Sequence, residues 1–597
     1  MGPAAARMDE ARDVLRRVFG FEHFRGVQPS VVERVLTGRS TLAVMPTGAG
    51  KSLTYQLPAT MLPGTCVVIS PLIALMHDQL RAARANGIRA ATLTSVDADW
   101  RETMDAYRAG ALDLLYVAPE RASQRPFREF LSAAPVALFA VDEAHCVSEW
   151  GHDFRPDYRQ LRPLLDSFSE VPRLALTATA DERTRADILE QLGIPPEGLI
   201  VAGFDRPNIR YTIRHRETAV RQLERLMAEQ PGPGIVYAPT RAKVERIAAQ
   251  LAERTGRPVL PYHAGLDPAA RAANQAAFVS SEEMVIVATV AFGMGIDKPD
   301  VRFVAHAGIP KSIEAYYQET GRAGRDGDPA QAVMLWAAGD FVQARQRLGE
   351  VDAERREGER ARLDALALLV ETPGCRRAVL LRHFGEEPPE ACGNCDNCRE
   401  APGVIDATEL ARKLLSAVYR TGQSFGFGHV QKVLTGAADD RVLQRGHDKL
   451  SVFGIVGVDE ARLLQPLSRA LQARGTLIAT EHGGLRLGSD AKAMLKGEQQ
   501  ISIVQPPPKS EGAGRQERNR VANPIGDPLF EALRELRREL AAEAQLPPYV
   551  IFHDATLREM AALRPVSRAD LAQINGVGTR KLEAYGDAFL ALIRRHG

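Results

Sequence analysis

Short apolar segments alternate with longer helix-forming segments through the first half of the chain. Apolar segments of this kind between helices are typical of strands buried on both faces of a parallel sheet. One series of such segments precedes Pro207 and a second series follows it. We therefore expect an α/β protein with two tandem parallel-sheet domains. The predicted strands are Thr41–Met45, Cys66–Ser70, Leu114–Val117, Ala137–Val141 and Arg173–Leu176, then Gly234–Tyr237, Met284–Ala288, Val301–Ala305 and Ala332–Trp336.

The pattern changes beyond Gly339, where a charged helical stretch, Asp352 to Val370, leads into a cluster of cysteines. The compact segment after it predicts a helix with one apolar face, formed by Leu410, Leu414, Leu415 and Val418. This segment ends in a predicted hairpin, Leu477–Thr480 with Leu485–Leu487, whose turn contains glycines.

A segment with Pro506–Pro508, charges and glycines predicts a flexible linker before a last helical module. Leu529, Leu533, Leu536 and Leu540 form the first apolar stripe of that module. The pattern divides the chain at 1–205, 206–345, 346–403, 404–500, 501–523 (the linker) and 524–597.

Composition excludes several classes of protein. The 597 residues are 45% hydrophobic and 25% charged, the usual mix of a globular protein. No apolar run is long enough for a transmembrane span, and the N-terminus lacks the apolar core of a signal peptide. We expect a cytoplasmic protein without a membrane partner. The net charge of +1 leaves a nucleic-acid partner open.

Residues Met45 to Ser52 read Met-Pro-Thr-Gly-Ala-Gly-Lys-Ser between a predicted strand and a helix. Glycines at 48 and 50 allow backbone N–H groups, including that of Thr47, to close around phosphates. Lys51 would reach the β- and γ-phosphates of ATP, and the Ser52 hydroxyl would ligate Mg²⁺. The strict P-loop pattern has glycine where Met45 stands. The assignment of a nucleotide-binding site therefore needs support from a second motif.

Val141-Asp-Glu-Ala-His145 ends another predicted strand and supplies that second motif. Asp142 would hold Mg²⁺ and Glu143 would orient and deprotonate the attacking water. The alternative is a solvated loop with two ordinary carboxylates. In the other domain, Arg322 and Arg325 lie on a glycine-rich turn, where they suit the charge that develops on a γ-phosphate. Taken alone, this turn could also be merely basic.

Four of the six cysteines, Cys375, Cys392, Cys395 and Cys398, are clustered. Four thiolates at this spacing predict a closed, structural Zn²⁺ site. An iron–sulfur cluster uses the same ligands, and the spacing alone does not exclude it.

The segment after His145 mixes aromatic side chains with a cation, a combination that stacks on unpaired bases and holds phosphate. Its members are Trp150, His152, Phe154, Arg155 and Tyr158. The alternative interpretation is a packed surface loop.

These motifs resemble superfamily 2 helicases, and in detail the RecQ family. Phe24-Arg25-x-x-Gln28 resembles the family's adenine-recognition motif, which places Arg25 and Gln28 at the nucleotide. Thr177-Ala-Thr179 resembles motif III, Thr289 to Asp297 motif V, and Gln318 to Arg325 motif VI. Ala49, Glu149 and Thr320 depart from the usual residues without removing a group that the chemistry needs.

The resemblance covers nearly the whole chain and implies two RecA-like lobes, a zinc module, a winged helix and a helicase-and-RNaseD C-terminal (HRDC) domain. It implies a strand-parting role for His482, at the tip of the predicted hairpin, although that hairpin is short. It also implies nucleic-acid contacts for Tyr549 and for the turn Asn575–Lys581. The alternatives are an uninvolved histidine and a tyrosine packed between helices.

We therefore predict an ATP-dependent DNA helicase of 3′→5′ polarity that uses ATP, Mg²⁺ and Zn²⁺ and acts in recombination, repair or fork maintenance. Expected partners are single-stranded and forked DNA and, as a candidate, a single-strand-binding protein. We expect a monomer in a bacterial cytoplasm or nucleoid rather than a nucleus. An RNA helicase and a non-catalytic DNA-junction scaffold are the alternatives.

Overall fold

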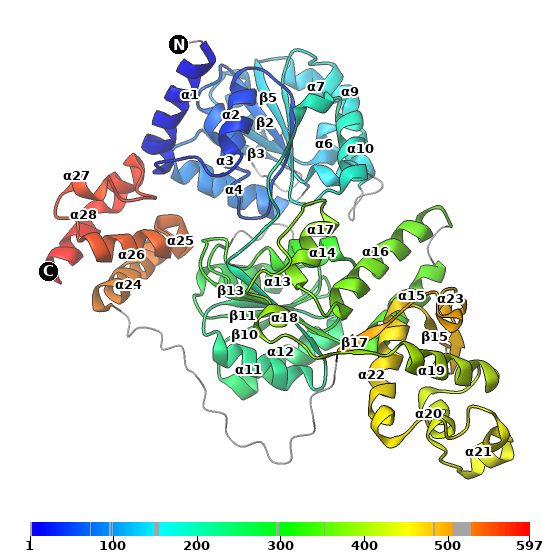
Figure 1. Ribbon diagram of the computed structural model, residues 1–597. Coiled ribbons are helices and arrows are strands. Elements are labelled where there is room, and N and C mark those ends of the chain that lie inside the picture. The colour runs from blue at the N-terminus through cyan, green and yellow to red at the C-terminus, as the bar shows by residue number, and fades with distance from the viewer. Residues whose placement is uncertain are drawn as a thin grey trace.

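Figure 1 shows the computed structural model, in which two stacked α/β lobes carry a further module on either side of the second lobe. The elements follow the chain from the first lobe through the second to the winged-helix segment, and finally to the C-terminal helices. The residues described are 3–71, 73–94, 97, 99–148, 155–293, 298–350, 353–480, 484–504 and 527–596.

The first lobe is built on a parallel sheet with the strand order β3-β4-β2-β5-β6-β1-β7. Successive residues of β2 face opposite sides of the sheet: Val67 and Ile69 belong to one apolar core, Cys66 and Val68 to the other. Its strands are continuous apolar runs because helices cover both faces. The strands are β1 (Thr41–Val44), β2 (Thr65–Ile69), β3 (Ala90–Leu93), β4 (Leu114–Val117), β5 (Val136–Val141), β6 (Arg173–Thr177) and β7 (Leu199–Val201).

The second lobe repeats this architecture with the order β10-β11-β9-β12-β13-β8, again entirely parallel. Its strands are β8 (Ile209–His215), β9 (Gly234–Tyr237), β10 (Val259–Tyr262), β11 (Val285–Ala288), β12 (Phe303–His306) and β13 (Ala330–Trp336). The predicted fold class is thus confirmed.

In the described parts of the two lobes, four strands were not predicted from the sequence: β3, β7, β8 and β10. The edge strand β8 shows why. Its sequence alternates apolar residues such as Ile209 and Tyr211 with Arg210 and Arg214, because only one face is buried against the core. A search for uninterrupted apolar runs finds central strands and misses edges of this kind.

The helices of both lobes and of the cysteine-bearing segment fill the connections between strands. In the first lobe they are α1 (Pro3–Val14), α2 (Gln28–Leu36), α3 (Leu53–Ala59), α4 (Ile73–Ala85), α5 (Trp100–Arg108), α6 (Pro119–Ala122), α7 (Arg125–Leu131), α8 (Pro156–Arg159), α9 (Arg162–Asp166) and α10 (Glu182–Leu192). In the second they are α11 (Ala219–Glu229), α12 (Arg241–Thr255), α13 (Pro268–Ser280), α14 (Ile313–Thr320) and α15 (Ala338–Arg347), followed by α16 (Ala353–Glu371), α17 (Arg376–His383) and α18 (Asp396–Arg399).

The cysteine-bearing segment shares a core with each lobe. Leu366 and Leu369 of α16 belong to the core of the second lobe, whereas Leu381 and Phe384, at the end of α17, belong to that of the first. The Phe384 ring stacks on Phe204, with centroids 4.7 Å apart and an interplanar angle of 16°. This segment therefore spans the junction between the lobes.

The segment from Val404 forms a separate core on the far side of the second lobe (Figure 1). Its elements are β14 (Val404–Asp406), α19 (Thr408–Arg420), α20 (Phe427–Thr435), α21 (Asp440–Gln444), α22 (Val458–Arg474), β15 (Leu477–Ala479), β16 (Leu485–Leu487), α23 (Ala491–Lys496) and β17 (Ser502–Val504). The antiparallel β15–β16 pair confirms the predicted hairpin. Because β17 pairs with β14, this module extends beyond the boundary predicted at residue 500. The rest of the predicted linker, 505–523, lies outside the described residues.

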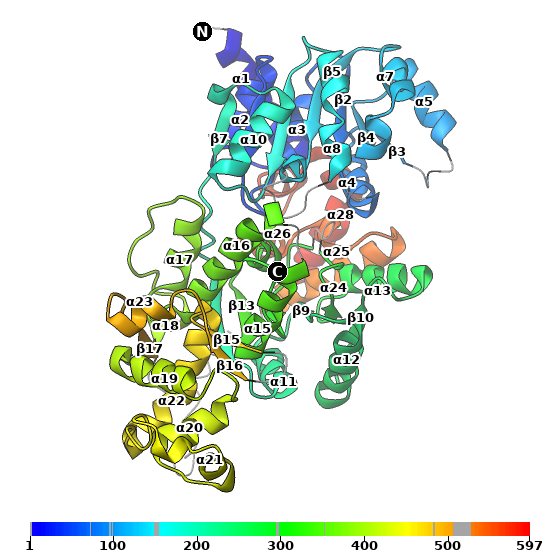
Figure 2. The same cartoon turned by 90° about the vertical axis from the view of Figure 1, so that its right-hand side faces the viewer.

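The C-terminal helices α24 (Pro528–Glu543), α25 (Pro548–Ile551), α26 (Asp554–Leu563), α27 (Arg568–Leu571) and α28 (Thr579–Arg595) pack around their own core. In Figure 2 they lie against both lobes, beside α4 and α13. A cavity of about 850 Å³ separates α4, α13 and α24, lined by residues such as Leu80, Val279 and Ala541. Among the described residues, no helix combines the length and apolar character needed to cross a bilayer.

Carboxylates of the second lobe hold this C-terminal module: Asp328 pairs with Arg558, and Glu282 binds three arginines of α24. Glu282 pairs with Arg534, with Arg537 at 2.7 Å and with Arg538 at 2.7 Å. Burial by itself would raise the pKa of Glu282, but the hydrogen bond from Arg538 and the neighbouring arginine charges lower it to about 2. The first lobe contributes the Gly20 carbonyl, which accepts a hydrogen bond of 2.7 Å from the Gly576 N–H. The C-terminal module therefore contacts both lobes.

We expect Glu282→Lys to release the C-terminal module, because a fourth cation would face the three arginines. Loss of one partner from a largely buried ion pair costs about 3–5 kcal/mol. Small-angle scattering should record a larger radius of gyration at neutral pH. In the unchanged protein the carboxylate favours docking fully above pH 4.5, its ordinary pKa, and this contribution is lost as the pH falls towards 2.

The neighbouring Glu283 is exposed, so Glu283→Lys makes the same charge change outside the cluster and should leave the radius unaltered. An unaltered radius in Glu282→Lys as well would mean that other contacts suffice to hold the module.

Candidate functional site

The P-loop connects β1 to α3, and its lysine forms a hydrogen bond with the main chain at the start of the loop. Lys51 Nζ donates a hydrogen bond of 3.2 Å to the Met45 carbonyl. Gly48 and Gly50 have φ angles of +84° and +75°, a region that disfavours residues with a side chain. A Cβ at Gly50 would lie 2.5 Å from Gln28 Nε2, and one at Gly48 would lie 3.3 Å from Arg325 Cγ. Both glycines thus serve backbone conformation and close packing, and methionine at the first motif position does not disturb either.

Gln28 is buried against this loop. Its Nε2 donates to the carbonyls of Ala49 and Gly50, at 2.9 and 3.3 Å, while its Oε1 accepts from the Arg25 N–H at 2.9 Å. The structure therefore places Gln28 against the P-loop and the Arg25 main chain next to Gln28, whereas their role in adenine recognition stays a prediction. In this arrangement the Gln28 amide buttresses the loop main chain.

The two acidic residues lie at the carboxyl end of β5. The Asp142 carbonyl accepts a hydrogen bond of 2.9 Å from the Tyr158 hydroxyl, and the Asp142 carboxylate accepts one of 3.0 Å from the Glu143 N–H. Glu143 has a φ of +48°, a strained value that fixes the direction of its side chain. Its Oε2 atom is buried and accepts no hydrogen bond from the residues described. This oxygen is suited to accept a proton from a water molecule.

His145 lies behind Glu143, with Nδ1 3.0 Å from the Thr177 hydroxyl and 3.4 Å from Glu143 Oε2. Complete burial, together with the positive charges of Lys51 and Arg155, lowers the pKa of His145 to about 3. The imidazole is therefore neutral near pH 7, and it links the acidic pair to the segment that resembles motif III.

The arginine-bearing loop, Gly321 to Gly327, follows α14 of the second lobe and meets the P-loop directly. Arg325 packs against Gly48, and a Cβ on Gly321 would lie 3.3 Å from Thr47 Cβ. Arg322 has different surroundings: it is buried, and its Nη2 would lie 3.1 Å from a Cβ on Gly293. The structure thus places Arg325 at the P-loop, whereas Arg322 lies within its own lobe.

The predicted DNA-contacting residues are described only in part. Trp150, His152, Phe154 and His482 lie outside the described residues. Arg155, where the description resumes, donates from its N–H to the Cys146 carbonyl at 2.9 Å and from Nη1 to the Pro71 carbonyl at 3.1 Å.

Tyr549 is half-buried, on the side of the C-terminal module that faces the second lobe. Its ring lies parallel to that of His553, at 6.4 Å between centroids, and it lines a small space with Glu282 and Lys298. The turn that was predicted to bind phosphate faces the first lobe, through a hydrogen bond from the Gly576 N–H to the Gly20 carbonyl, and its binding of phosphate stays a prediction. Both features that were assigned to nucleic acid therefore lie at the docking interface in this structure.

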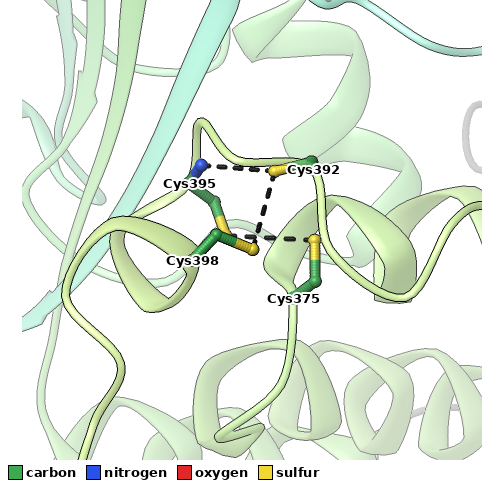
Figure 3. Close-up of side chains that lie close together, drawn as sticks. All are labelled: Cys375, Cys392, Cys395 and Cys398. Carbon is green, nitrogen blue, oxygen red and sulfur yellow. Dashed lines mark hydrogen bonds between the residues drawn. The ribbon is translucent and has the colours of Figure 1, made fainter.

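The four clustered cysteines converge from three places in the chain (Figure 3): the start of α17, a turn, and the segment that includes α18. Their sulfur atoms all lie within 4.8 Å of one another, with two pairs at 4.0 Å, Cys375 with Cys395 and Cys392 with Cys398. Four zinc-bound sulfurs, each about 2.3 Å from the metal, would be about 3.8 Å apart in a tetrahedron. The arrangement fits such a site.

Main-chain N–H groups support the same sulfurs. Cys375 Sγ accepts from Ala378 at 3.4 Å, and Cys392 Sγ accepts from Asn394 at 3.4 Å and from Cys395 at 3.3 Å. Burial raises the pKa of Cys395 to about 12, so a bound cation is needed to hold this group as a thiolate at neutral pH.

Residues between the cysteines attach this centre to the second lobe. Asp396 pairs with Arg376 at 3.2 Å and accepts a hydrogen bond of 2.9 Å from the Ile213 N–H of β8. Sequence reasoning missed these roles, and it also missed Arg206, which lies between the lobes. Polar residues next to Pro207 are typical of an ordinary connection, and nothing local indicated their partners.

Family models match consecutive parts of the chain: DEAD/DEAH box helicase (25–188), helicase conserved C-terminal domain (218–327), RecQ zinc-binding (338–399), RQC domain (401–511) and HRDC domain (527–593). Their order agrees with the resemblance found in the sequence.

Full-length relatives match as well. The ATP-dependent DNA helicase RecQ of Haemophilus influenzae is 44% identical, over 98% of this chain and 96% of its own. The protein of the same name from Bacillus subtilis is 37% identical, over 99% of both chains. The ATP-dependent DNA helicase Q-like 2 of Arabidopsis thaliana is 33% identical, over 98% of this chain and 83% of its own. Among solved structures, the helicase MrfA bound to DNA has a TM-score of 0.48 and 18% identity, over 62% of this chain and 57% of that one.

We expect Cys395→Ser to lower metal content and stability together. A structural zinc contributes on the order of 10 kcal/mol of apparent folding free energy in small modules. Elemental analysis should find about one zinc per chain in the unchanged protein and a large loss in the variant, together with a lower unfolding temperature.

Cys66→Ala removes a buried thiol outside the cluster and should keep the metal. Iron in place of zinc, or full metal content in Cys395→Ser, would contradict the assignment.

Proposed function

This chain belongs to the RecQ family of ATP-dependent DNA helicases, and we propose that it hydrolyses ATP between its two lobes to move 3′→5′ along DNA. The observation that carries this proposal is the packing of Arg325 from one lobe against Gly48 of the P-loop in the other. A phosphate bound by the P-loop would lie next to an arginine whose position depends on lobe closure, so hydrolysis and lobe movement are coupled.

In the proposed mechanism, Lys51 holds the β- and γ-phosphates and Gln28 and Arg25 recognise the base. Ser52 and Asp142 would hold Mg²⁺, which offsets phosphate charge when bound. Glu143 orients the attacking water through its Oε2, which accepts no hydrogen bond from the described part of the chain, and accepts the proton of that water.

Arg325 stabilises the charge that develops on the γ-phosphate. Arg322, buried beside Gly293, would support the second lobe's part of the site from within. Its position supports a weaker or indirect contact with phosphate than that of Arg325.

We further propose that the loop from Ser148 to Tyr158 transmits DNA binding to the acidic pair. The support lies at its ends: Ser148 is buried, and the Tyr158 hydroxyl bonds to the main chain of Asp142 itself. A displacement of this loop by DNA would be felt at Asp142 and Glu143.

Full-length similarity to DNA helicases favours DNA over RNA as the substrate, and the complete set of ATP-site residues argues against a passive scaffold. The proposal includes the predicted domain limits, with the winged-helix module extended to Val504. It also includes a role in recombination and repair, a monomeric state, a bacterial cytoplasmic location and a single-strand-binding protein as partner.

We expect Lys51→Ala to reduce DNA-stimulated ATP turnover by about 100-fold or more, since one preorganised cation at the phosphates is lost. Zinc content and unfolding temperature should stay the same. The measurement is steady-state ATP hydrolysis with single-stranded DNA and, in parallel, with RNA of equal length. Ordinary turnover in a folded Lys51→Ala protein would disprove the P-loop assignment, and stronger stimulation by RNA would disprove the choice of DNA.

We expect Trp150→Ala to lose most DNA-stimulated ATP turnover and unwinding while DNA affinity falls modestly. Stacking of one aromatic on a base contributes roughly 1–3 kcal/mol, and the winged helix provides other contacts. The matched control is Trp100→Ala, since Trp100 lies exposed at the start of α5 in the same lobe. A collapse of affinity with full turnover at saturating DNA would make the loop a plain binding surface.

A further inference from the structure

Arg206, in the connection between the lobes, binds the main chain of both halves of the ATP site. Its Nη1 donates to the carbonyl of Thr47 in the P-loop, at 2.6 Å, and to that of Gly321 in the arginine-bearing loop, at 3.1 Å. Its Nη2 donates to the carbonyls of Ala323 and Gly324, both at 2.9 Å. One planar guanidinium therefore spans four acceptors from two lobes.

Asn208 also binds the main chain of the arginine-bearing loop. Its Nδ2 donates to the Gly324 carbonyl at 2.8 Å and to the Asp328 carbonyl at 2.9 Å. Gly324 has a φ of +55°, and a Cβ there would lie 2.6 Å from Asn208 Nδ2. The main chain on both sides of Arg322, and immediately before Arg325, is thereby held by two residues of the interlobe connection.

The connection that carries Arg206 is itself anchored. The Phe204 N–H donates to the Glu386 carboxylate, and the Phe204 carbonyl accepts from the Tyr317 hydroxyl at 2.7 Å. On the other side of Arg206, the Pro207 carbonyl accepts from Asn394 Nδ2 at 3.1 Å, and the Ile209 carbonyl accepts from Arg377 at 2.7 Å. Arg206 thus projects from a segment that the zinc module keeps in place.

We infer that Arg206 is a positioning residue for hydrolysis. It sets the distance between the P-loop and the arginine-bearing loop, and through that distance the approach of Arg325 to the γ-phosphate. Its fork suits the task because two rigid, coplanar donor groups define the acceptor positions, which a single ammonium cannot do. This inference rests on the role proposed above for Arg325.

Replacing Arg206 with glutamine or lysine in the full-length protein tests the inference. Both variants should lower kcat at saturating DNA by roughly 10- to 100-fold, the scale of a misplacement of about 1 Å at a reacting centre. The KM for ATP and the affinity for a fluorescent ADP analogue should change much less, because the P-loop and Lys51 remain. Trapping of ADP with aluminium fluoride, which mimics the transferred phosphoryl group, should weaken in parallel with kcat.

Arg257 provides a matched control. It also donates to four main-chain carbonyls, those of Met227, Gln230, Gly232 and Glu283, but all of them lie in the second lobe. Arg257→Gln should therefore affect the unfolding temperature about as much as Arg206→Gln while leaving kcat nearly unchanged. Equal kcat losses in the two variants would mean that Arg206 has only a structural role, and would overturn the inference.

Arg325→Gln distinguishes a failure of the role inferred for Arg206 from a failure of the role proposed for Arg325. If Arg325→Gln loses kcat and Arg206→Gln keeps it, the inference fails while the proposed mechanism stands. If Arg325→Gln keeps kcat, the proposed role of Arg325 fails and the inference fails with it. Loss in both, with trapping impaired and ADP affinity retained, is the result expected.

Discussion

The structure depends on one close approach, that of Arg325 in the second lobe to Gly48 in the first. Catalysis of phosphoryl transfer is mainly positioning and charge stabilisation, so a site assembled from two rigid sheets works at one separation. Glycine at position 48 permits that separation for two reasons: it adopts a φ of +84°, and it presents no Cβ to Arg325. A side chain there would be strained and would also crowd Arg325, which would have to shift by a few tenths of an ångström.

Elements outside the two sheets maintain that separation. The interlobe connection binds both phosphate loops through Arg206, and the zinc module packs Phe384 against Phe204 while Arg377 holds the Ile209 carbonyl. The zinc module therefore does more than stabilise itself, because its failure to fold would release the segment that carries Arg206. On the other side, the C-terminal module reaches Glu282 in one lobe and Gly20 in the other. Its docking would resist the lobe movement that is proposed above to accompany hydrolysis.

Arginine binding to main-chain carbonyls recurs in these contacts, and it explains why they are hard to infer. Every residue has a carbonyl acceptor. The sequence therefore gives no sign of which residues an arginine such as Arg206 or Arg377 binds, because the partner's side chain takes no part. An acidic partner is visible in the sequence, yet Glu282 is separated from Arg534, Arg537 and Arg538 by 252 to 256 positions along the chain, which include the zinc module and the whole winged-helix module. Its pairing follows from the docking of a module and from no local pattern.

The sequence by itself determined the features that depend on neighbouring residues. Central strands, the P-loop, the acidic pair after β5, the four-cysteine cluster and the β15–β16 hairpin all follow from short-range patterns, since burial on both faces, phosphate binding and metal ligation each demand particular residue types at particular spacings. Edge strands such as β8 were missed because apolar and polar residues alternate in them, so that they contain no uninterrupted apolar run. Tertiary structure alone decided that Arg325 meets the P-loop while Arg322 stays within its lobe, that Gln28 buttresses the P-loop, and that Tyr549 faces the second lobe. These outcomes depend on how separately folded units pack, and packing is set by shape and charge across residues far apart in the chain.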